Sequence, residues 1–234
     1  MFQFKQFNVD QSGCAMKINT DGVLLGAITE ANDPATILDI GTGTGVIALM
    51  LAQKFTEAKI DAVEIDTDAA QTAKRNFEGS PFADRLNIYA LGFDNYFELF
   101  PEKKYDLIVS NPPFYTSSLK SPGAKKTLAK HTDIDFFERL IKEISGRLSP
   151  DGLCWLILPV GISEAVADFA EGRNMFLQKL TDIHSYPRAA PHRNVLCFGF
   201  DNVLTEIDEL NIYKAVGIYS EEYQKLLQPY FLAF

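Results

Sequence analysis

The residues of this sequence best suited to chemistry are four that directly follow an apolar run at 105–110. They are Asn111, Pro112, Pro113 and Phe114. An asparagine amide followed by two prolines, which lack backbone N–H groups, presents a rigid set of hydrogen-bond acceptors, and the phenylalanine adds an aromatic plane. Such a set suits a flat –NH2 group on a conjugated system, such as the exocyclic amine of adenine. The alternative is a bare turn, because Asn-Pro-Pro also ends a strand in extended geometry.

A glycine-rich turn stands earlier in the chain, at the end of the apolar run 35–40. It contains Gly41, Gly43 and Gly45, with Asp39 before them. Glycines let the backbone turn sharply and let a ligand approach closely. The third position after Gly43 is Val46, so the G-x-G-x-x-G fingerprint of dinucleotide-binding proteins is missing. G-x-G-x-G after an acidic residue instead resembles the first motif of S-adenosylmethionine-dependent methyltransferases, and a tight turn without a ligand is the alternative.

Further carboxylates follow the next predicted strands. Glu64 stands at the end of the second one and could accept hydrogen bonds from both ribose hydroxyls of an adenosine, or be a solvated strand end. Asp94, after the third strand, could accept from the adenine amine of the cofactor or be an ordinary turn aspartate. Asp66 and Asp68 are expected to cap the helix that begins beside them.

These motifs need a scaffold that brings strand ends together, and the sequence predicts one. Short aliphatic runs alternate with helical patterns, which is typical of an α/β fold with a mostly parallel sheet and helices on both faces. Ligands of such sheets bind at the carboxyl ends of the strands, where the residues at 111–114 stand. The predicted strands are 35–40, 59–65, 86–90, 105–110 and 152–159, with an antiparallel pair at 176–186 and 194–202. The predicted helices are 44–55, 67–78, 133–148, capped by Thr132-Asp133, and 163–172.

We expect one domain over residues 1–234, because no repeat and no low-complexity linker interrupts the chain. Its core is 35–203, preceded by a segment at 1–34 that covers the substrate or cofactor. An extension at 204–234 contains a small strand and a helix near 220–228. A monomer is the expected state.

Charge is distributed unevenly along the chain. The net charge of −9 argues against indiscriminate coating of nucleic acid, since phosphate binding needs cations. Two stretches, 115–131 and 183–193, nevertheless carry cations and no carboxylate. The candidate contacts to substrate phosphates in them are Lys125, Lys126, Lys130, Arg188 and Arg193. For each of them a solvated loop residue is the alternative.

The remaining composition indicates a cytoplasmic protein without a metal. The three cysteines have no metal-like spacing and form an odd set, which favours free thiols in a reducing compartment. No signal peptide is recognisable, and no apolar run approaches the ~20 residues needed to cross a bilayer.

The chain as a whole resembles a known family. The stretches 4–27, 38–53, 61–66, 106–114, 129–133 and 219–232 occur in the order found in bacterial tRNA1(Val) adenine-N6-methyltransferases. The resemblance implies a Rossmann-like class I methyltransferase fold and S-adenosylmethionine-dependent N6-methylation of the adenine on the 3′ side of the anticodon. It implies that the target base binds at 111–114, and that Thr20 and Asp21 help to close the pocket over the methionine end of the cofactor. The family has arginine where this chain has Lys130. If that arginine makes a bidentate phosphate contact, lysine would weaken the contact without abolishing it.

Other activities compete with this interpretation. Glutamine methyltransferases of release factors also use an NPP-aromatic motif, but they usually carry a sizeable helical domain before the glycine motif. Guanine-N2 methyltransferases of ribosomal RNA typically duplicate the domain, which 234 residues do not permit. Another RNA or DNA amino-methyltransferase, or a non-catalytic nucleotide-binding module, is the remaining alternative.

Overall fold

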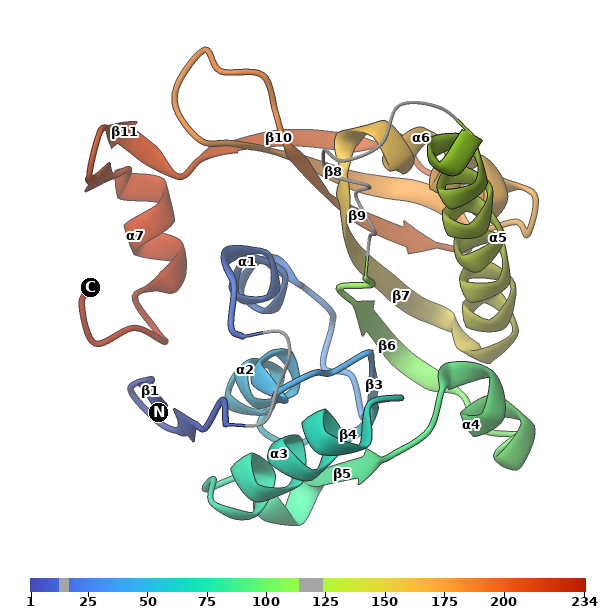
Figure 1. The fold of residues 1–234 in the computed structure, drawn as a ribbon, viewed down its shortest axis with the longest axis horizontal. Helices are drawn as coiled ribbons and strands as arrows, with labels where there is room; N and C mark the ends of the chain where they lie inside the picture. The colour runs from blue at the N-terminus through green and yellow to red at the C-terminus, as the bar shows by residue number, and fades with distance from the viewer. Residues whose placement is uncertain (13–16, 114–123) are drawn as a thin grey trace.

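The protein is built on an 8-stranded sheet with helices on both faces (Figure 1). The structure is a computed structural model that describes residues 1–12, 17–113 and 124–234, with only the backbone described over 124–133. In spatial order the strands are β10 (Glu206–Asn211), β8 (Phe176–His184), β9 (Arg193–Gly199), β7 (Leu148–Pro159), β6 (Tyr105–Ser110), β3 (Thr36–Ile40), β4 (Lys59–Val63) and β5 (Leu86–Tyr89).

Strand direction divides the sheet into two parts. The five strands from β5 to β7 are parallel to one another. β9 is antiparallel to both β7 and β8, which confirms the predicted antiparallel pair. The strand expected in the C-terminal extension is β10, and it joins the sheet edge parallel to β8.

The helices form one layer on each face of the sheet (Figure 1). One layer contains α1 (Thr20–Ile28), α2 (Val46–Lys54) and α3 (Thr67–Glu78), and the other contains α4 (Phe93–Leu99), α5 (Ala124–Arg147) and α6 (Val160–Glu171). Successive strand residues face opposite layers. Ile37 therefore packs in the core under α1 and α2, whereas Leu38 packs in the core under α4 and α5. This burial on both faces explains why the strands read as continuous apolar runs.

The two ends of the chain lie against each other beside α1. Small strand pairs occur at each end, β1 (Phe2–Gln3) with β2 (Asn8–Val9) and β11 (Tyr213–Ala215) with β12 (Ile218–Tyr219), followed by α7 (Glu221–Leu227). Phe4 forms a β-bridge with Phe231, and Lys5 Nζ donates to the carbonyl of Phe234 at 2.9 Å. Both termini lie on the same side of the molecule (Figure 1).

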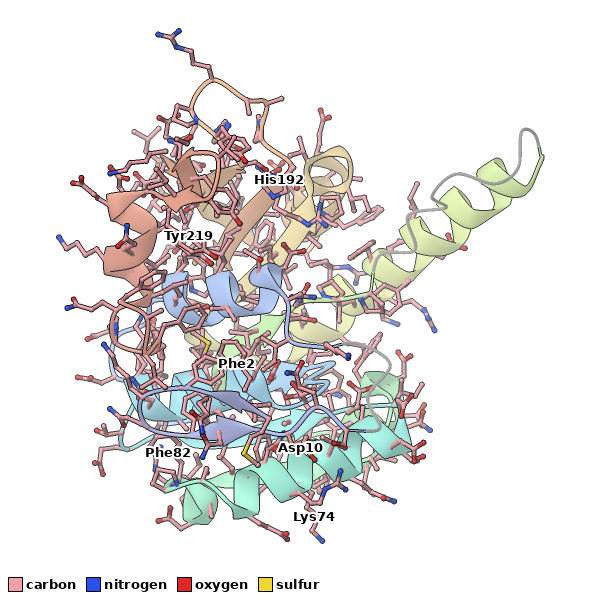
Figure 2. All side chains as sticks on the ribbon, turned by 60° about the vertical axis from the view of Figure 1, so that its left-hand side comes forward. Phe2, Asp10, Lys74, Phe82, His192 and Tyr219 are labelled. Atoms are coloured by element: carbon pink, nitrogen blue, oxygen red, sulfur yellow. The ribbon has the colours of Figure 1, made fainter. Side chains whose placement is uncertain are left out.

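Some predicted element boundaries were wrong. The helix expected at 133–148 begins at Ala124, and Thr132-Asp133 lies inside it instead of capping it. Strong helix formers such as alanine and lysine precede that pair, so the helix continues through it. In Figure 2 the first turns of α5 extend away from the body of the protein. Glu64 lies just beyond β4, which ends at Val63 and not at residue 65.

Candidate active site

Three neighbouring strands end in register, and the predicted motifs begin one residue later. Ile40 at the end of β3 pairs with Val63 of β4 and with Ser110 of β6. Ser110 Oγ also donates to the Ile40 carbonyl at 2.8 Å, which ties the two central strand ends together. The residues that follow these three positions are Gly41, Glu64 and Asn111. The glycine loop and the Asn-Pro-Pro corner are therefore adjacent at the carboxyl edge of the sheet.

Glycine occupies the three positions of the loop for different structural reasons. Gly41, Gly43 and Gly45 all have positive φ, at 72°, 57° and 84°. A Cβ atom at Gly41 or Gly43 would meet no atom of the described residues within 4 Å, so the backbone borders open space in that part of the structure. At Gly45 a Cβ would lie 2.4 Å from Phe77 Cε1 of α3. Glycine is required at 45 for packing against α3, while the surface at 41 and 43 is open to a ligand.

The Glu64 carboxylate is held by backbone amides on two sides. Oε2 accepts from the Gly43 amide at 2.8 Å, and Oε1 accepts from the Asp66 amide at 2.9 Å. Both oxygens retain a further lone pair for a ligand. Asp66 accepts from the amides of Asp68 and Ala69, which confirms that Asp66 caps α3. Asp68, expected to share this role, lies in the first turn of the helix.

Asp39 is buried beneath the glycine loop. Its Oδ2 accepts from Thr42 Oγ1 at 2.6 Å. Its Oδ1 is buried and has no hydrogen-bond partner among residues 1–12, 17–113 and 124–234. Burial raises the pKa of the Asp39 carboxyl to about 7. An unpaired buried carboxylate oxygen is costly unless a donor or cation reaches it.

The first turn of α1 borders the Asn-Pro-Pro corner. A Cβ atom at Gly22 would lie 3.8 Å from Asn111 Nδ2. Asn19 caps the helix, since its side chain accepts from the Gly22 amide at 2.9 Å. This helix was not among those predicted from the sequence, although Asn19 followed by an acidic first turn is a start signal. Pro112 is buried and Pro113 is exposed, and Phe114 falls outside the described residues.

Two predicted site residues bind each other. Asp21 was expected at the cofactor and Arg193 at the RNA, but Arg193 Nε donates to Asp21 Oδ2 at 2.7 Å. Arg193 also donates from a terminal guanidinium nitrogen to the His192 carbonyl at 2.9 Å. Thr20, the first residue of α1, is exposed next to this ion pair.

Asp94 lies in a helix instead of the turn suggested by sequence. It is in the first turn of α4, and its Oδ2 lies 3.4 Å from Arg139 of α5. The Asp94 side chain is 44% exposed, so a ligand can still reach it. Its contact with the adenine of a cofactor stays a prediction.

The predicted RNA contacts lie on two segments. Arg188 is exposed, with a φ of 66°, in the loop between β8 and β9. Because Arg193 at the end of this loop pairs with Pro159 at the end of β7, the loop shares the sheet edge of the Asn-Pro-Pro corner. Lys125, Lys126 and Lys130 belong to the first turns of α5, and their side chains lie outside the described residues.

Metal and thiol chemistry has little support in the part of the chain that the structure describes. No group of three histidine, cysteine or acidic residues is arranged there to hold a metal ion. Cys154 and Cys197 are buried as free thiols, and burial raises the pKa of the Cys197 thiol to about 12. Cys14 lies outside the described residues. None of the described helices combines the length and the apolar character that spanning a membrane requires.

Comparison with known proteins agrees with this geometry. The methyltransferase small domain family matches residues 17–163, more than half of the chain. The tRNA1(Val) (adenine(37)-N6)-methyltransferase of Pedobacter heparinus is 47% identical over 100% of this chain and 98% of its own length. The protein of the same description from Bacteroides fragilis is 41% identical, with coverage of 99% and 97%. A predicted O-methyltransferase from Agrobacterium tumefaciens shares the fold, with a TM-score of 0.69 and 15% identity over 90% of this chain and 96% of its own. The chain therefore belongs to the tRNA1(Val) (adenine(37)-N6)-methyltransferase family.

Proposed function

We propose that this protein transfers a methyl group from S-adenosylmethionine to N6 of the adenine on the 3′ side of the anticodon in tRNA1(Val). Relatives described as tRNA1(Val) (adenine(37)-N6)-methyltransferases, 40–47% identical over nearly the whole chain, support this choice of substrate. The observation that carries the chemistry is the pairing of Ile40 with Ser110, because it places the glycine loop and Asn111 at adjacent strand ends. A methyl donor on the loop would thus lie next to a base held at the corner.

The residues at the glycine loop fit this cofactor. Gly41 and Gly43 leave open space against their backbone, as a closely approaching ligand requires. Glu64 presents an oriented carboxylate for the two ribose hydroxyls. The unpaired Oδ1 of Asp39 is suited to the ammonium of the methionine end. When bound, S-adenosylmethionine supplies an already activated methyl group.

The Asn111 corner prepares the acceptor nitrogen. An adenine amine is a weak nucleophile because its lone pair is delocalised into the ring. Asn111 Oδ1 and the Pro112 carbonyl accept hydrogen bonds from its two N–H groups and turn the lone pair toward the methyl position. The corner therefore contributes to catalysis by aligning the acceptor nitrogen. Stacking of the base on Phe114 adds ~1–3 kcal/mol. Once the methyl group has added, the nitrogen is positively charged and its proton is acidic enough to pass to water, so no strong base is needed.

Substrate binding must bring one base out of a structured RNA. The base is splayed into the pocket at the cost of its stacking in the loop. Lys125, Lys126, Lys130 and Arg188 are the proposed phosphate contacts, and they offset the overall negative charge locally. We place the activity in the cytoplasm and infer a monomer.

Labelled S-adenosylmethionine tests this proposal against its nearest alternative. The wild-type protein is incubated with total tRNA and, separately, with release factor. We expect label in tRNA, recovered as N6-methyladenosine. Label in the release factor, or in tRNA lacking N6-methyladenosine, would contradict the proposal.

A further inference from the structure

We propose that Arg193 is a positioning residue for the reaction, which fixes the first turn of α1 against the Asn111 corner through Asp21. This inference rests on the proposed function and changes the role expected for Arg193. A phosphate-binding arginine acts on RNA affinity, whereas a positioning arginine acts on the geometry of the pocket wall.

The ion pair joins elements that are distant in sequence. Arg193 opens β9 at the carboxyl end of β7, and Asp21 lies in the first turn of α1, 172 residues away. The Arg193 and Asp21 side chains are 24% and 16% exposed. Salt screens such a partly buried pair less than an exposed one. The 2.7 Å separation gives a charge-assisted hydrogen bond between the two elements.

The first turn of α1 depends on this bond more than the rest of the helix does. From Val23 to Ala27 every residue is buried, and Gly26 packs closely over Met50 of α2. Asn19 and Thr20, by contrast, are exposed. Within the described residues, Asp21 is therefore the side chain of this turn that hydrogen-bonds to the sheet edge. Gly22, the next residue, borders Asn111.

The surroundings of the guanidinium favour this role over phosphate binding. Two of its donors are directed at Asp21 and at the His192 carbonyl. Asp21 beside it adds a negative charge that opposes an approaching phosphate. The helix N-terminus in turn favours the Asp21 carboxylate, because its dipole is positive there. Burial lowers the pKa of His192, and the positive charge of Arg193 lowers it further. His192 therefore adds little positive charge near neutral pH.

The variants Arg193→Gln, Asp21→Asn, their combination and Arg193→Lys test the proposal. We expect each single neutralisation to lower kcat about 10- to 100-fold. The double variant should lose no more than either single one, since both single substitutions remove the same ion pair. Arg193→Lys should recover part of the rate.

The salt dependence of tRNA binding distinguishes the two roles. The slope of log K against log salt should stay as in the wild type for Arg193→Gln, and should decrease by about 1, the value for one phosphate contact, for Arg188→Gln. Arg173→Gln, on an exposed turn after α6, is the control for charge loss.

A structural readout keeps the test independent of activity. Hydrogen exchange at the amides of Gly22 and Val23 should accelerate in Arg193→Gln, while amides of α2 stay protected. A flatter salt slope in Arg193→Gln with unchanged kcat and unchanged exchange would overturn the inference. Additive losses in the double variant would also overturn it. If the wild type methylates no tRNA, the proposed function fails, and the exchange measurement still decides the role of Arg193.

Discussion

The backbone amide of Gly43 donates to Glu64 Oε2 at 2.8 Å, which joins the glycine loop to the end of β4. The second carboxylate oxygen accepts from the Asp66 amide at 2.9 Å. Glu64 is thus oriented before any ligand arrives, and the shape of the loop depends on a residue from the neighbouring strand. A preorganised acceptor loses little freedom when ribose hydroxyls bind to it.

Glu64→Gln should weaken S-adenosylmethionine binding about 10- to 100-fold, the effect of losing a charge-assisted hydrogen bond of ~1.5–3 kcal/mol. An amide nitrogen would then face either the Gly43 or the Asp66 amide, so the side chain must also turn. Isothermal titration calorimetry measures the change, with the exposed Glu98→Gln as a matched control. Wild-type affinity in Glu64→Gln would exclude Glu64 from the cofactor site.

Gly45→Ala should mainly reduce stability, whereas Gly41→Ala should mainly reduce cofactor binding. At Gly45 the new methyl group meets Phe77 and the φ of 84° is strained, so unfolding free energy should fall by about 2–5 kcal/mol. At Gly41 only strain of about 1–2 kcal/mol is expected, but the methyl group projects into the ligand space. Thermal denaturation and cofactor titration on both variants separate the effects. Equal stability losses with unchanged binding would remove the distinction between the two glycines.

Asp39→Asn should stabilise the free protein and weaken cofactor binding. The folded pKa of Asp39 is about 7, above the ordinary value of 3.8, so folding favours the protonated form. The wild type therefore loses stability as pH rises from about 4 to about 7, and the variant avoids this loss. Its advantage in Tm should be larger at pH 8 than at pH 5.

The same substitution should change the pH dependence of binding. Cofactor affinity of the wild type should increase as Asp39 ionises through pH 7, whereas that of Asp39→Asn should not. A variant that binds as the wild type does at every pH would exclude an ammonium contact at Oδ1.

Neutralising Lys125 and Lys126 together should reduce tRNA affinity and its salt dependence. Two lost phosphate contacts correspond to a change of about 1.4–1.8 in the slope of log K against log salt. Filter binding at several salt concentrations gives the slope. Lys59 and Lys74, both exposed on other parts of the surface, provide the control pair. An identical slope in the Lys125 and Lys126 variant would assign these lysines to solvent.

Much of the site could be predicted because it depends on local patterns. The runs ending at Ile40 and Ser110 are apolar and short, so their ends locate the glycine loop and the corner. Asp66 follows a cap pattern with a local partner. In these cases the signal and its structural consequence lie within a few residues of each other.

The parts that could not be predicted depend on distant contacts or on weak local signals. The helix α1 is buried over most of its length, so it lacks the polar face that identifies an amphipathic helix. The Asp21–Arg193 pair joins segments that only the folded sheet brings together. Phe77 filling the space at Gly45 is likewise a packing relation that no glycine motif reveals.

Methyl transfer to defined transcripts tests the shared reaction centre most directly. Transcripts of tRNA1(Val) with adenine or guanine at position 37 are incubated with labelled S-adenosylmethionine and with wild-type or Asn111→Ala protein. We predict label only in the adenine transcript, as N6-methyladenosine, and a rate about 10²- to 10³-fold lower for Asn111→Ala with cofactor binding retained. Equal labelling of both transcripts, or a near-normal rate for Asn111→Ala, would contradict the account.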